Sequence, residues 1–207
     1  MKIIFDLDHT LFKTALFKEE LFDILVKNGA SREDVLETYK VYRDKVGGAY
    51  DFAAHADILS GNSVDFSKEG ALREWNDFLR GDFTRYVDRE AFKVLESFKN
   101  KGFELILLTK GHSDLQSHKM KKSGLDVFFD EIHICQDGKL PALEKIQPQA
   151  GDWMVNDTWK EAVETRKEYP ELNQLLLKID DNWQQQNQTE IDIPKLSSIS
   201  ELSEYIK

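Results

Sequence analysis

Two aspartates stand two positions apart, directly after an apolar run near the start of the sequence. Asp6 and Asp8 follow Lys2-Ile3-Ile4-Phe5, a pattern that favours a buried strand with polar groups at its end. Because alternate residues of an extended chain point the same way, the two carboxylates share one side. Close carboxylates repel each other, and proteins usually give such a pair a metal ion or a shared proton. A solvated loop with two acids is the alternative interpretation of this pair taken alone.

A second group of acids surrounds another expected strand, at 152–155. Asp152 and Asp157 flank its end, and Glu161 follows Asp157 by four residues. Residues four apart share one face of a helix, so Asp157 and Glu161 lie side by side on the helix that we expect next. Acids at two strand ends favour a functional site over a solvated loop.

The elements that must position these acids alternate between strand and helix from residue 89 onwards. Apolar periodicity predicts strands at 2–5, 103–108, 131–135, 152–155 and 174–179. It predicts helices at 89–101, 113–123, 140–146, 158–168 and 199–206. This alternation predicts an α/β fold with a Rossmann-like, doubly wound parallel sheet. Ligands bind beyond the carboxyl ends of such strands, which makes Asp6, Asp8, Thr109 and Asp157 neighbours.

Residues 13–85 interrupt that alternation with a stretch rich in Glu, Lys, Leu, Phe and Ala. Helical spacing of apolar residues occurs over 19–28 and 32–46, and more weakly over 68–79, with glycine-containing turns between them. We therefore expect a small α-helical domain at 13–85, inserted into a catalytic core made of residues 1–12 and 86–207.

Three segments, in this order, resemble the motifs of haloacid dehalogenase-type phosphatases. Phe5-Asp6-Leu7-Asp8-His9-Thr10-Leu11 resembles the first motif, an apolar strand that ends in Asp-X-Asp-X-Thr. Leu107-Leu108-Thr109-Lys110-Gly111 looks like the second motif, and Trp153-Met154-Val155-Asn156-Asp157, with Glu161 beyond it, looks like the acidic fourth motif. The resemblance covers nearly the whole chain and implies a Rossmann-like core with a helical cap over the active site.

The resemblance also implies a magnesium-dependent phosphatase that acts on a small phosphorylated metabolite. Asp6 would be the nucleophile and form an aspartyl-phosphate. Asp8 would give a proton to the leaving alcohol and then activate water. Mg²⁺ would lie between Asp6, the backbone carbonyl of Asp8, Asp157 and a phosphate oxygen. The implied phosphate-binding residues are Thr109, Lys110, Gly111 and Lys139.

The lysine of the third motif has two candidates. Lys139 follows an expected strand and precedes a helical segment that contains Leu, as the family lysine does, whereas Lys145 would lie on that helix. We favour Lys139. Glu161 replaces the more frequent Asp and would support the site by holding Lys139 in place, and Asn156 replaces the commonest Gly. Lys119 is expected on a helix surface.

Other conspicuous side chains are interpreted as structural. His112 and His118 are expected at the surface, and Cys135 inside a strand. Several side chains of the helical domain could reach a leaving group, although ordinary surface or core packing is the favoured interpretation of each: Tyr39, Tyr42, Arg43, Tyr50 and His55.

Composition narrows the class of partner. The formal net charge of −10 argues against nucleic acid or an anionic membrane surface. No apolar run approaches the roughly 18 residues of a membrane span, the first residues lack the layout of a signal peptide, and the single cysteine excludes an internal disulfide. We expect a cytoplasmic monomer.

Three other activities fit the same scaffold. A haloalkanoic acid dehalogenase needs neither magnesium nor the second acid, so Asp8 and Asp157 count against it. A sugar phosphomutase would keep both aspartates and the metal. A catalytically silent binding or regulatory protein would not need the full set of chemical groups that the sequence retains.

Overall fold

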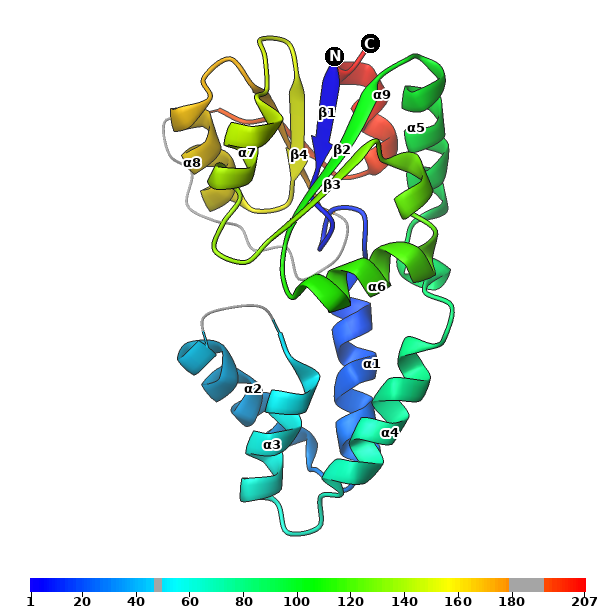
Figure 1. Ribbon diagram of the computed structural model, residues 1–207, viewed down its shortest axis with the longest axis vertical. Coiled ribbons are helices and arrows are strands. Elements are labelled where there is room, and N and C mark those ends of the chain that lie inside the picture. The colour runs from blue at the N-terminus through cyan, green and yellow to red at the C-terminus, as the bar shows by residue number, and fades with distance from the viewer. Residues whose placement is uncertain (47–49, 179–191) are drawn as a thin grey trace.

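A parallel sheet forms the centre of the computed structural model, which describes residues 1–46, 50–178 and 192–207 and, for residues 43–46, the backbone alone. Among these residues six strands pair in the order β3-β2-β1-β4-β5-β6 (Figure 1). They are β1 (Lys2–Phe5), β2 (Glu104–Lys110), β3 (Glu131–Cys135), β4 (Trp153–Asn156), β5 (Asn173–Leu177) and β6 (Lys195–Leu196). The order reverses between β1 and β4, so the carboxyl ends of these two strands open at the switch point of a doubly wound sheet.

Helices cover both faces of the sheet. Alternate residues of β1 enter two separate apolar clusters, with Ile3 and Phe5 on one face and Ile4 on the other. The first face packs against α5 (Arg89–Asn100), α6 (Ser113–Ser123) and α9 (Leu202–Tyr205), and the second against α7 (Leu140–Ile146) and α8 (Trp159–Glu168). Short 3₁₀ turns occupy Thr84–Tyr86, Asp126–Phe128 and Ile199–Glu201. Burial from both sides explains why the central strands read as continuous apolar runs.

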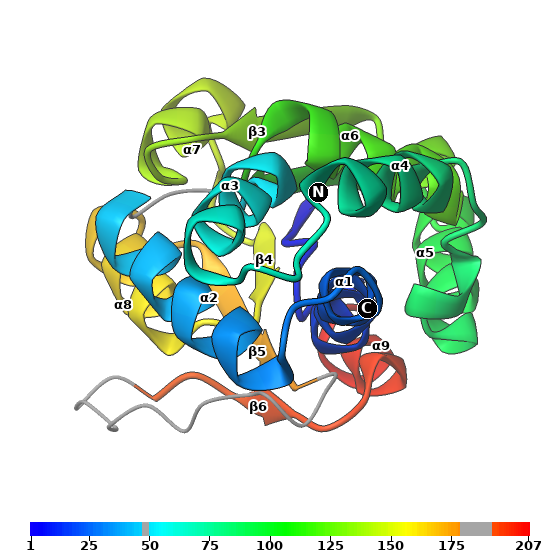
Figure 2. The same cartoon turned by 90° about the horizontal axis from the view of Figure 1, so that it is seen from below.

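Four helices, which we call the helical insertion, lie beyond the carboxyl end of the sheet (Figures 1 and 2). They are α1 (Thr14–Lys27), α2 (Arg32–Val46), α3 (Phe52–Asn62) and α4 (Lys68–Leu79). The chain leaves the core at Phe12 and returns at Val87, and these two residues form an antiparallel bridge. Beside it, the Lys13 N–H donates to the Tyr86 carbonyl at 2.7 Å. The insertion is therefore attached through two connections that run side by side.

The expected order of elements in the core is confirmed. Their ends are displaced by at most two residues except in the last helix, where 199–201 form a 3₁₀ turn and α9 begins at Leu202. One α-helix, α3, and one strand, the short edge strand β6, were not predicted. Ile179, the expected end of the fifth strand, and the expected surface loop at 184–188 lie outside the described residues. Among the helices that are described, none has the length and apolar character needed to cross a membrane.

Candidate active site

A cavity of about 150 Å³ lies where β1, β2 and β4 end. Its walls carry four carboxylates and two lysines at the positions expected from the sequence, together with one histidine and one threonine: Asp6, Asp8, His9, Lys110, Lys139, Asp157, Thr158 and Glu161. The topology explains this meeting, because the carboxyl ends of parallel strands share one edge of the sheet. Charged groups gathered in a small cavity are typical of a site for an ionic ligand.

Lys139 is the buried cation of this cavity. Its Nζ lies 2.9 Å from Asp6 Oδ1 and 2.7 Å from Glu161 Oε2. Burial by itself would lower the lysine pKa, but the charges of the two carboxylates raise it well above its usual range. Lys139 therefore stays protonated. The other candidate lysine, Lys145, is exposed on α7.

Gly138 turns the chain so that Lys139 can enter the cavity. Its φ of 141° lies in the region that glycine adopts without strain. Lys139 then occupies the N-cap position of α7, with a proline in the first turn of that helix. Proline suits the beginning of a helix because the first N–H groups have no partner inside the helix. The turn between β3 and α7 thus fixes the base of the lysine side chain.

Asp6 is only 5% exposed, and its position is fixed by the sheet. Its N–H donates to the Val155 carbonyl at 2.9 Å, which ties the end of β1 to β4. Burial raises the pKa of its carboxyl to about 7, in spite of the opposing charge of Lys139, and the charges of Asp157 and Glu161 act in the same direction as burial. The side chain thus lies in a strongly charged, poorly hydrated environment, where a bound cation would favour its ionised form.

Asn156 organises the acidic end of β4 through three hydrogen bonds. Its Oδ1 accepts from Lys139 Nζ at 3.3 Å and from the Asp157 N–H at 2.9 Å, while its Nδ2 donates to Glu161 Oε2 at 3.1 Å. The amide thus connects the side chains of Lys139 and Glu161 with the backbone of Asp157. From the sequence, this asparagine was identified only as a replacement for the commonest glycine. Thr158 Oγ1 donates to Asp157 Oδ1 at 2.9 Å, and burial raises the pKa of Asp157.

Asp8 is held by three donors. Its Oδ1 accepts from Thr14 Oγ1 at 2.5 Å and lies 2.6 Å from Lys119 Nζ, while its Oδ2 accepts from Gln116 Nε2 at 2.7 Å. Burial would raise the pKa of Asp8, but the charge of Lys119 and these hydrogen bonds hold it below its usual range. His9 adopts a φ of 58° directly after Asp8, which turns the backbone towards α1.

The prediction that Lys119 lies on a helix surface is wrong. The residue is 4% exposed, because the face of α6 that carries Lys119 packs against the ends of β1 and β2 rather than facing solvent. Gln116, three residues earlier on the same face, was not identified as a site residue from the sequence. Its spacing from Lys119 was the available signal, since residues three apart in a helix are neighbours.

Of the expected phosphate-binding residues at the end of β2, only Lys110 lines the cavity, and Thr109 and Gly111 lie behind it. Thr109 is fully buried, and its Oγ1 accepts from Gln116 Nε2 at 2.7 Å. The Gly111 N–H is already engaged with the Cys135 carbonyl at 3.0 Å. A Cβ on Gly111 would approach Gln116 Cγ to 2.8 Å, so this glycine permits the close packing of α6.

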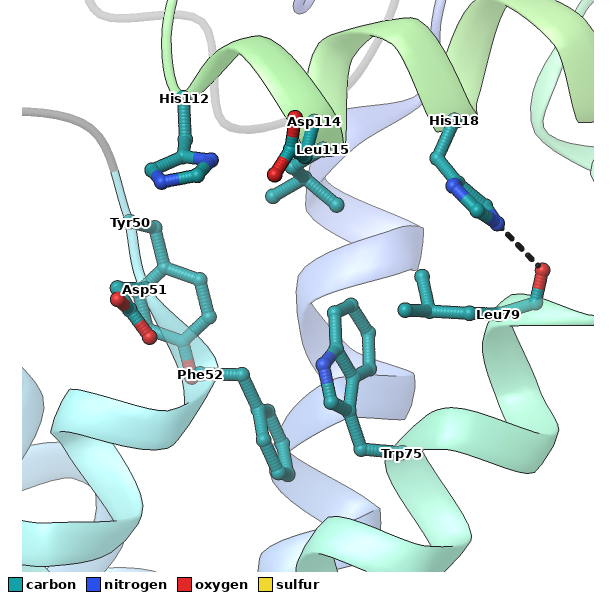
Figure 3. A pocket seen from close by; sticks show the side chains of 9 residues that line it. All are labelled: Tyr50, Asp51, Phe52, Trp75, Leu79, His112, Asp114, Leu115 and His118. Atoms are coloured by element: carbon teal, nitrogen blue, oxygen red, sulfur yellow. Dashed lines mark hydrogen bonds between the residues drawn. The ribbon is translucent and has the colours of Figure 1, made fainter.

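A second cavity, of about 170 Å³, lies between the helical insertion and α6 (Figure 3). Aromatic, acidic and imidazole side chains line it: Tyr50, Asp51, Phe52, Trp75, Leu79, His112, Asp114, Leu115 and His118. Phe52 and Trp75 stack with ring centroids 4.8 Å apart. His118 Nε2 donates to the Leu79 carbonyl at 3.1 Å, so this histidine is half-buried rather than a surface residue as expected.

The other aromatic residues considered from the sequence take different positions. Tyr42 and His55 are buried inside the helical insertion, and Tyr39 packs beside them. Tyr50 lines the second cavity. The side chain of Arg43 lies outside the described residues. His112 is exposed, and Cys135 is half-buried at the end of β3.

The acids of the first cavity fit a hard divalent cation. In the described part of the chain no group of three or more His, Cys, Asp or Glu side chains is arranged to hold a metal ion. Mg²⁺ commonly takes one or two carboxylates from a protein and completes its shell with water and phosphate oxygens. Asp6 and Asp157 supply two carboxylates whose pKa values are both raised in this cavity. A cation between them would relieve that unfavourable environment.

Solved structures share this fold. One is a haloacid dehalogenase-like hydrolase of Burkholderia xenovorans LB400, with a TM-score of 0.78 and 16% identity, covering 98% of this chain and 94% of that one. A second is a haloacid dehalogenase phosphatase of Thermococcus onnurineus, with a TM-score of 0.62 and 21% identity, covering 99% of this chain and 97% of that one. A third is the magnesium-bound hydrolase YfnB of Bacillus subtilis, with a TM-score of 0.60 and 17% identity, covering 99% of this chain and 97% of that one. Dehalogenases and a beta-phosphoglucomutase of Thermotoga maritima are also similar, so this likeness shows the fold alone.

Sequence comparison identifies the family. No curated protein matches the chain. The model of one family, the haloacid dehalogenase-like hydrolases, matches residues 3–150, which include β1, the helical insertion, β2 and the turn that carries Lys139. The chain therefore belongs to the haloacid dehalogenase-like hydrolase family.

Proposed function

We propose that the protein is a magnesium-dependent phosphatase that hydrolyses a small phosphomonoester through an aspartyl-phosphate on Asp6. The contact between Asp6 and Lys139, 2.9 Å apart in a cavity that also holds Asp8 and Asp157, carries this proposal. A carboxylate beside a fixed cation is a suitable nucleophile for an anionic phosphoryl group. The phosphatase of Thermococcus onnurineus has the same fold, which is consistent with the proposal.

The first half of the reaction uses both aspartates. An oxygen of Asp6 attacks phosphorus, and the bond between phosphorus and the ester oxygen breaks. Lys139 holds the Asp6 carboxylate in place and balances charge as the phosphoryl group approaches. The incoming phosphoryl group places negative charge beside Asp8, which favours the protonated form of its carboxyl. The ester oxygen takes that proton and leaves as an alcohol. Mg²⁺, when bound by Asp6 and Asp157, would offset the negative charge of the phosphoryl oxygens.

The second half regenerates the enzyme. Asp8, now ionised, takes a proton from a water molecule, and the resulting hydroxide attacks phosphorus. The bond between Asp6 and phosphorus breaks, so phosphate leaves and Asp6 returns to a carboxylate. Lys110 lines the cavity and can bind the phosphate oxygens together with Lys139. Thr109 supports this wall from behind through Gln116.

The second cavity is the place that we propose for the leaving group. His112 on its wall follows Thr109 by three residues, and an extended chain covers at most about 3.6 Å per residue. The Cα atoms of these two residues are therefore within about 11 Å of each other. Phe52 and Trp75 offer an apolar surface for a flat or aliphatic group. Such a cavity would contribute binding energy remote from the reacting phosphorus.

Phosphate release from p-nitrophenyl phosphate and from a panel of phosphorylated metabolites, with magnesium and with EDTA, tests the proposal. We expect release that needs magnesium and that falls to background in Asp6→Asn. Lys139→Met should lower kcat/KM by about 100-fold or more, by analogy with other preorganised electrostatic groups, whereas Lys145→Met should leave it within twofold.

Two outcomes would contradict the phosphatase. Turnover that persists in EDTA would contradict the need for the metal. Rearranged phosphate esters without free phosphate would indicate a phosphomutase instead. Circular dichroism of each variant checks that a loss of activity does not reflect a loss of fold.

A further inference from the structure

Lys119 is a buried charge that is directed at one carboxylate. It is 4% exposed, and its Nζ lies 2.6 Å from Asp8 Oδ1. On its other side are the rings of Phe12 and Phe17, with centroids 5.3 and 5.4 Å from Nζ. Within the described residues it forms no ion pair with another acid. Burying an ammonium group is costly unless it is paired, so the position of Lys119 depends on Asp8.

Gln116 donates a hydrogen bond to the other oxygen of Asp8, but it also has other acceptors within reach. Its Nε2 donates to Asp8 Oδ2 at 2.7 Å, and the same nitrogen lies 2.7 Å from Thr109 Oγ1 and 3.3 Å from the Lys110 carbonyl. An amide nitrogen carries two hydrogens. Gln116 can therefore release Asp8 Oδ2 and still donate both hydrogens, to Thr109 and Lys110. Lys119, in contrast, has no second acid among the described residues to which it could move if it left Asp8.

We infer that Lys119 and Gln116 are positioning residues that give the two oxygens of Asp8 different tasks. Oδ1 is the anchored oxygen, held by Lys119 and by Thr14. Oδ2 is the reacting oxygen, which Gln116 aims and then releases to the substrate. This assignment rests on the proposed phosphatase function and adds two residues of α6 to its machinery.

The assignment specifies one proton transfer. With substrate bound, the negative charge of the phosphoryl group favours protonation of Asp8, and Oδ2 carries that proton. As the bond between phosphorus and the ester oxygen breaks, the proton moves to the ester oxygen. The carboxylate that remains takes a proton back on Oδ2 from the attacking water. Oδ1 stays bound to Lys119 throughout, so Asp8 does not rotate between the two steps.

Leaving groups of different basicity test the role of Lys119. p-Nitrophenolate departs without a proton, whereas the alkoxide of benzyl phosphate needs one, so the second substrate depends on general acid catalysis. That catalysis contributes about 10²- to 10⁴-fold in enzymes. Asp8→Asn gives the reference pattern, with a large loss of kcat/KM for benzyl phosphate and a small loss for p-nitrophenyl phosphate. kcat/KM reports only the steps up to the first irreversible one.

We expect Lys119→Met to follow that pattern, with about a 10- to 100-fold loss for benzyl phosphate and less than about threefold for p-nitrophenyl phosphate. Gln116→Leu should show the same selectivity with a smaller loss. Lys121→Met changes an exposed lysine on the same helix and should alter neither value. Equal losses on both substrates, or no loss, would overturn the inference.

A crystal structure of Lys119→Met gives a readout that does not depend on turnover. We expect the Asp8 carboxylate to leave the orientation in which Oδ1 faces residue 119 and Oδ2 faces Gln116. An unchanged Asp8 would overturn the inference even if the protein proved to have another activity. A wild-type enzyme no more active than Asp6→Asn on p-nitrophenyl phosphate would instead count against the proposed function. The crystal structure would then decide the positioning role alone. If Lys119→Met does not fold, Gln116→Leu provides both measurements.

Discussion

Glu161 Oε2 and Lys139 Nζ lie 2.7 Å apart, with the carboxylate coming from the first turn of α8 and the ammonium from the beginning of α7. Glu161 also accepts from Asn156 Nδ2 at 3.1 Å. Burial would raise its pKa, but the charge of Lys139 keeps it below its usual range. Two helices on the same side of the sheet are thereby connected through the cavity, and the lysine is held from both sides.

Shortening or neutralising Glu161 should weaken this support. Glu161→Asp removes one methylene and Glu161→Gln removes the charge, so both leave Lys139 with Asp6 as its charged partner. We expect each change to lower kcat/KM by about tenfold, equivalent to about 1.4 kcal/mol. Glu164→Gln, one turn further along α8, is the control and should have no effect. A Glu161→Gln enzyme with unchanged kcat/KM would show that Asp6 and Asn156 suffice to hold the lysine.

Asn156 should matter for stability as well as for the site. Asn156→Gly introduces the residue commonest at this position among similar motifs, but it deletes the three hydrogen bonds of a side chain that is 1% exposed. Buried groups left without partners cost about 1–3 kcal/mol each, so we expect a loss of about 2–4 kcal/mol in the free energy of unfolding. Urea denaturation measures it, with the exposed Asn62→Gly as control. A loss below about 1 kcal/mol would mean that water replaces the amide.

Trp75 should set the preference for large leaving groups. Its indole forms part of the second cavity (Figure 3) and stacks on Phe52. Trp75→Ala removes that surface, so we expect KM for p-nitrophenyl phosphate to rise by about 3- to 10-fold, because one well-packed contact contributes about 1 kcal/mol. KM for methyl phosphate, which is too small to reach the cavity, should not change. A parallel rise for both substrates would place the leaving group elsewhere.

His55 is held as a neutral imidazole inside the helical insertion. Thr38 Oγ1 donates to the Asp34 carbonyl at 2.6 Å and therefore accepts from His55 Nε2 at 2.9 Å. His55 Nδ1 then accepts from the Tyr50 hydroxyl, also at 2.9 Å. Burial lowers the pKa of His55 to about 4. A protonated ring would have to give up the bond from Tyr50, which agrees with this direction.

The contribution of His55 to the stability of the protein should therefore rise with pH through the window set by its pKa. In the unfolded chain the pKa of histidine is about 6.5, so between about 4 and 6.5 the unfolded state binds more protons than the folded state. The stabilisation is complete above about pH 6.5 and is lost as the pH falls towards 4, by up to about 3 kcal/mol at 1.36 kcal/mol per pKa unit.

Unfolding in urea at pH 4.5 and at pH 7.5, for the wild type and His55→Gln, isolates this contribution. The stability advantage of the wild type should be larger at pH 7.5 and should shrink at pH 4.5. The variant controls for other groups that titrate over the same range. An advantage that does not change with pH would mean that His55 is accommodated as a cation.

The sequence predicted best those features that depend on the backbone alone, namely the order of strands and helices and the residues at strand ends. Asp6 and Asp157 meet because both follow strands of one parallel sheet, and the alternation of strands and helices is visible in the apolar pattern. α3 was not predicted because its residues Phe52–Asn62 combine alanines, a histidine and a glycine without a clear apolar stripe. Asp51 marks its start by accepting from the Ala54 N–H at 3.1 Å, a cap that a short polar side chain can make in many turns.

Side-chain partners across the sheet were less accessible. A lysine within a predicted helix is expected to be exposed to solvent. The neighbouring sequence does not distinguish Lys119 from Lys121 or Lys122. What distinguishes it is Asp8, 111 positions earlier in the chain. Asn156 is also hard to assign from sequence, because two of its three partners, Lys139 and Glu161, reach it only once α7 and α8 are packed on the sheet.

The paired connections at Phe12 and Val87 have a consequence for how the protein can change over evolutionary time. The bridge between them fixes the separation of the two points where the helical insertion departs and returns, whatever lies between. Residues can be added to or lost from the insertion without shifting the register of β1 against β2. Changes in the insertion can thus alter its wall of the second cavity while the position of Asp6 stays unchanged.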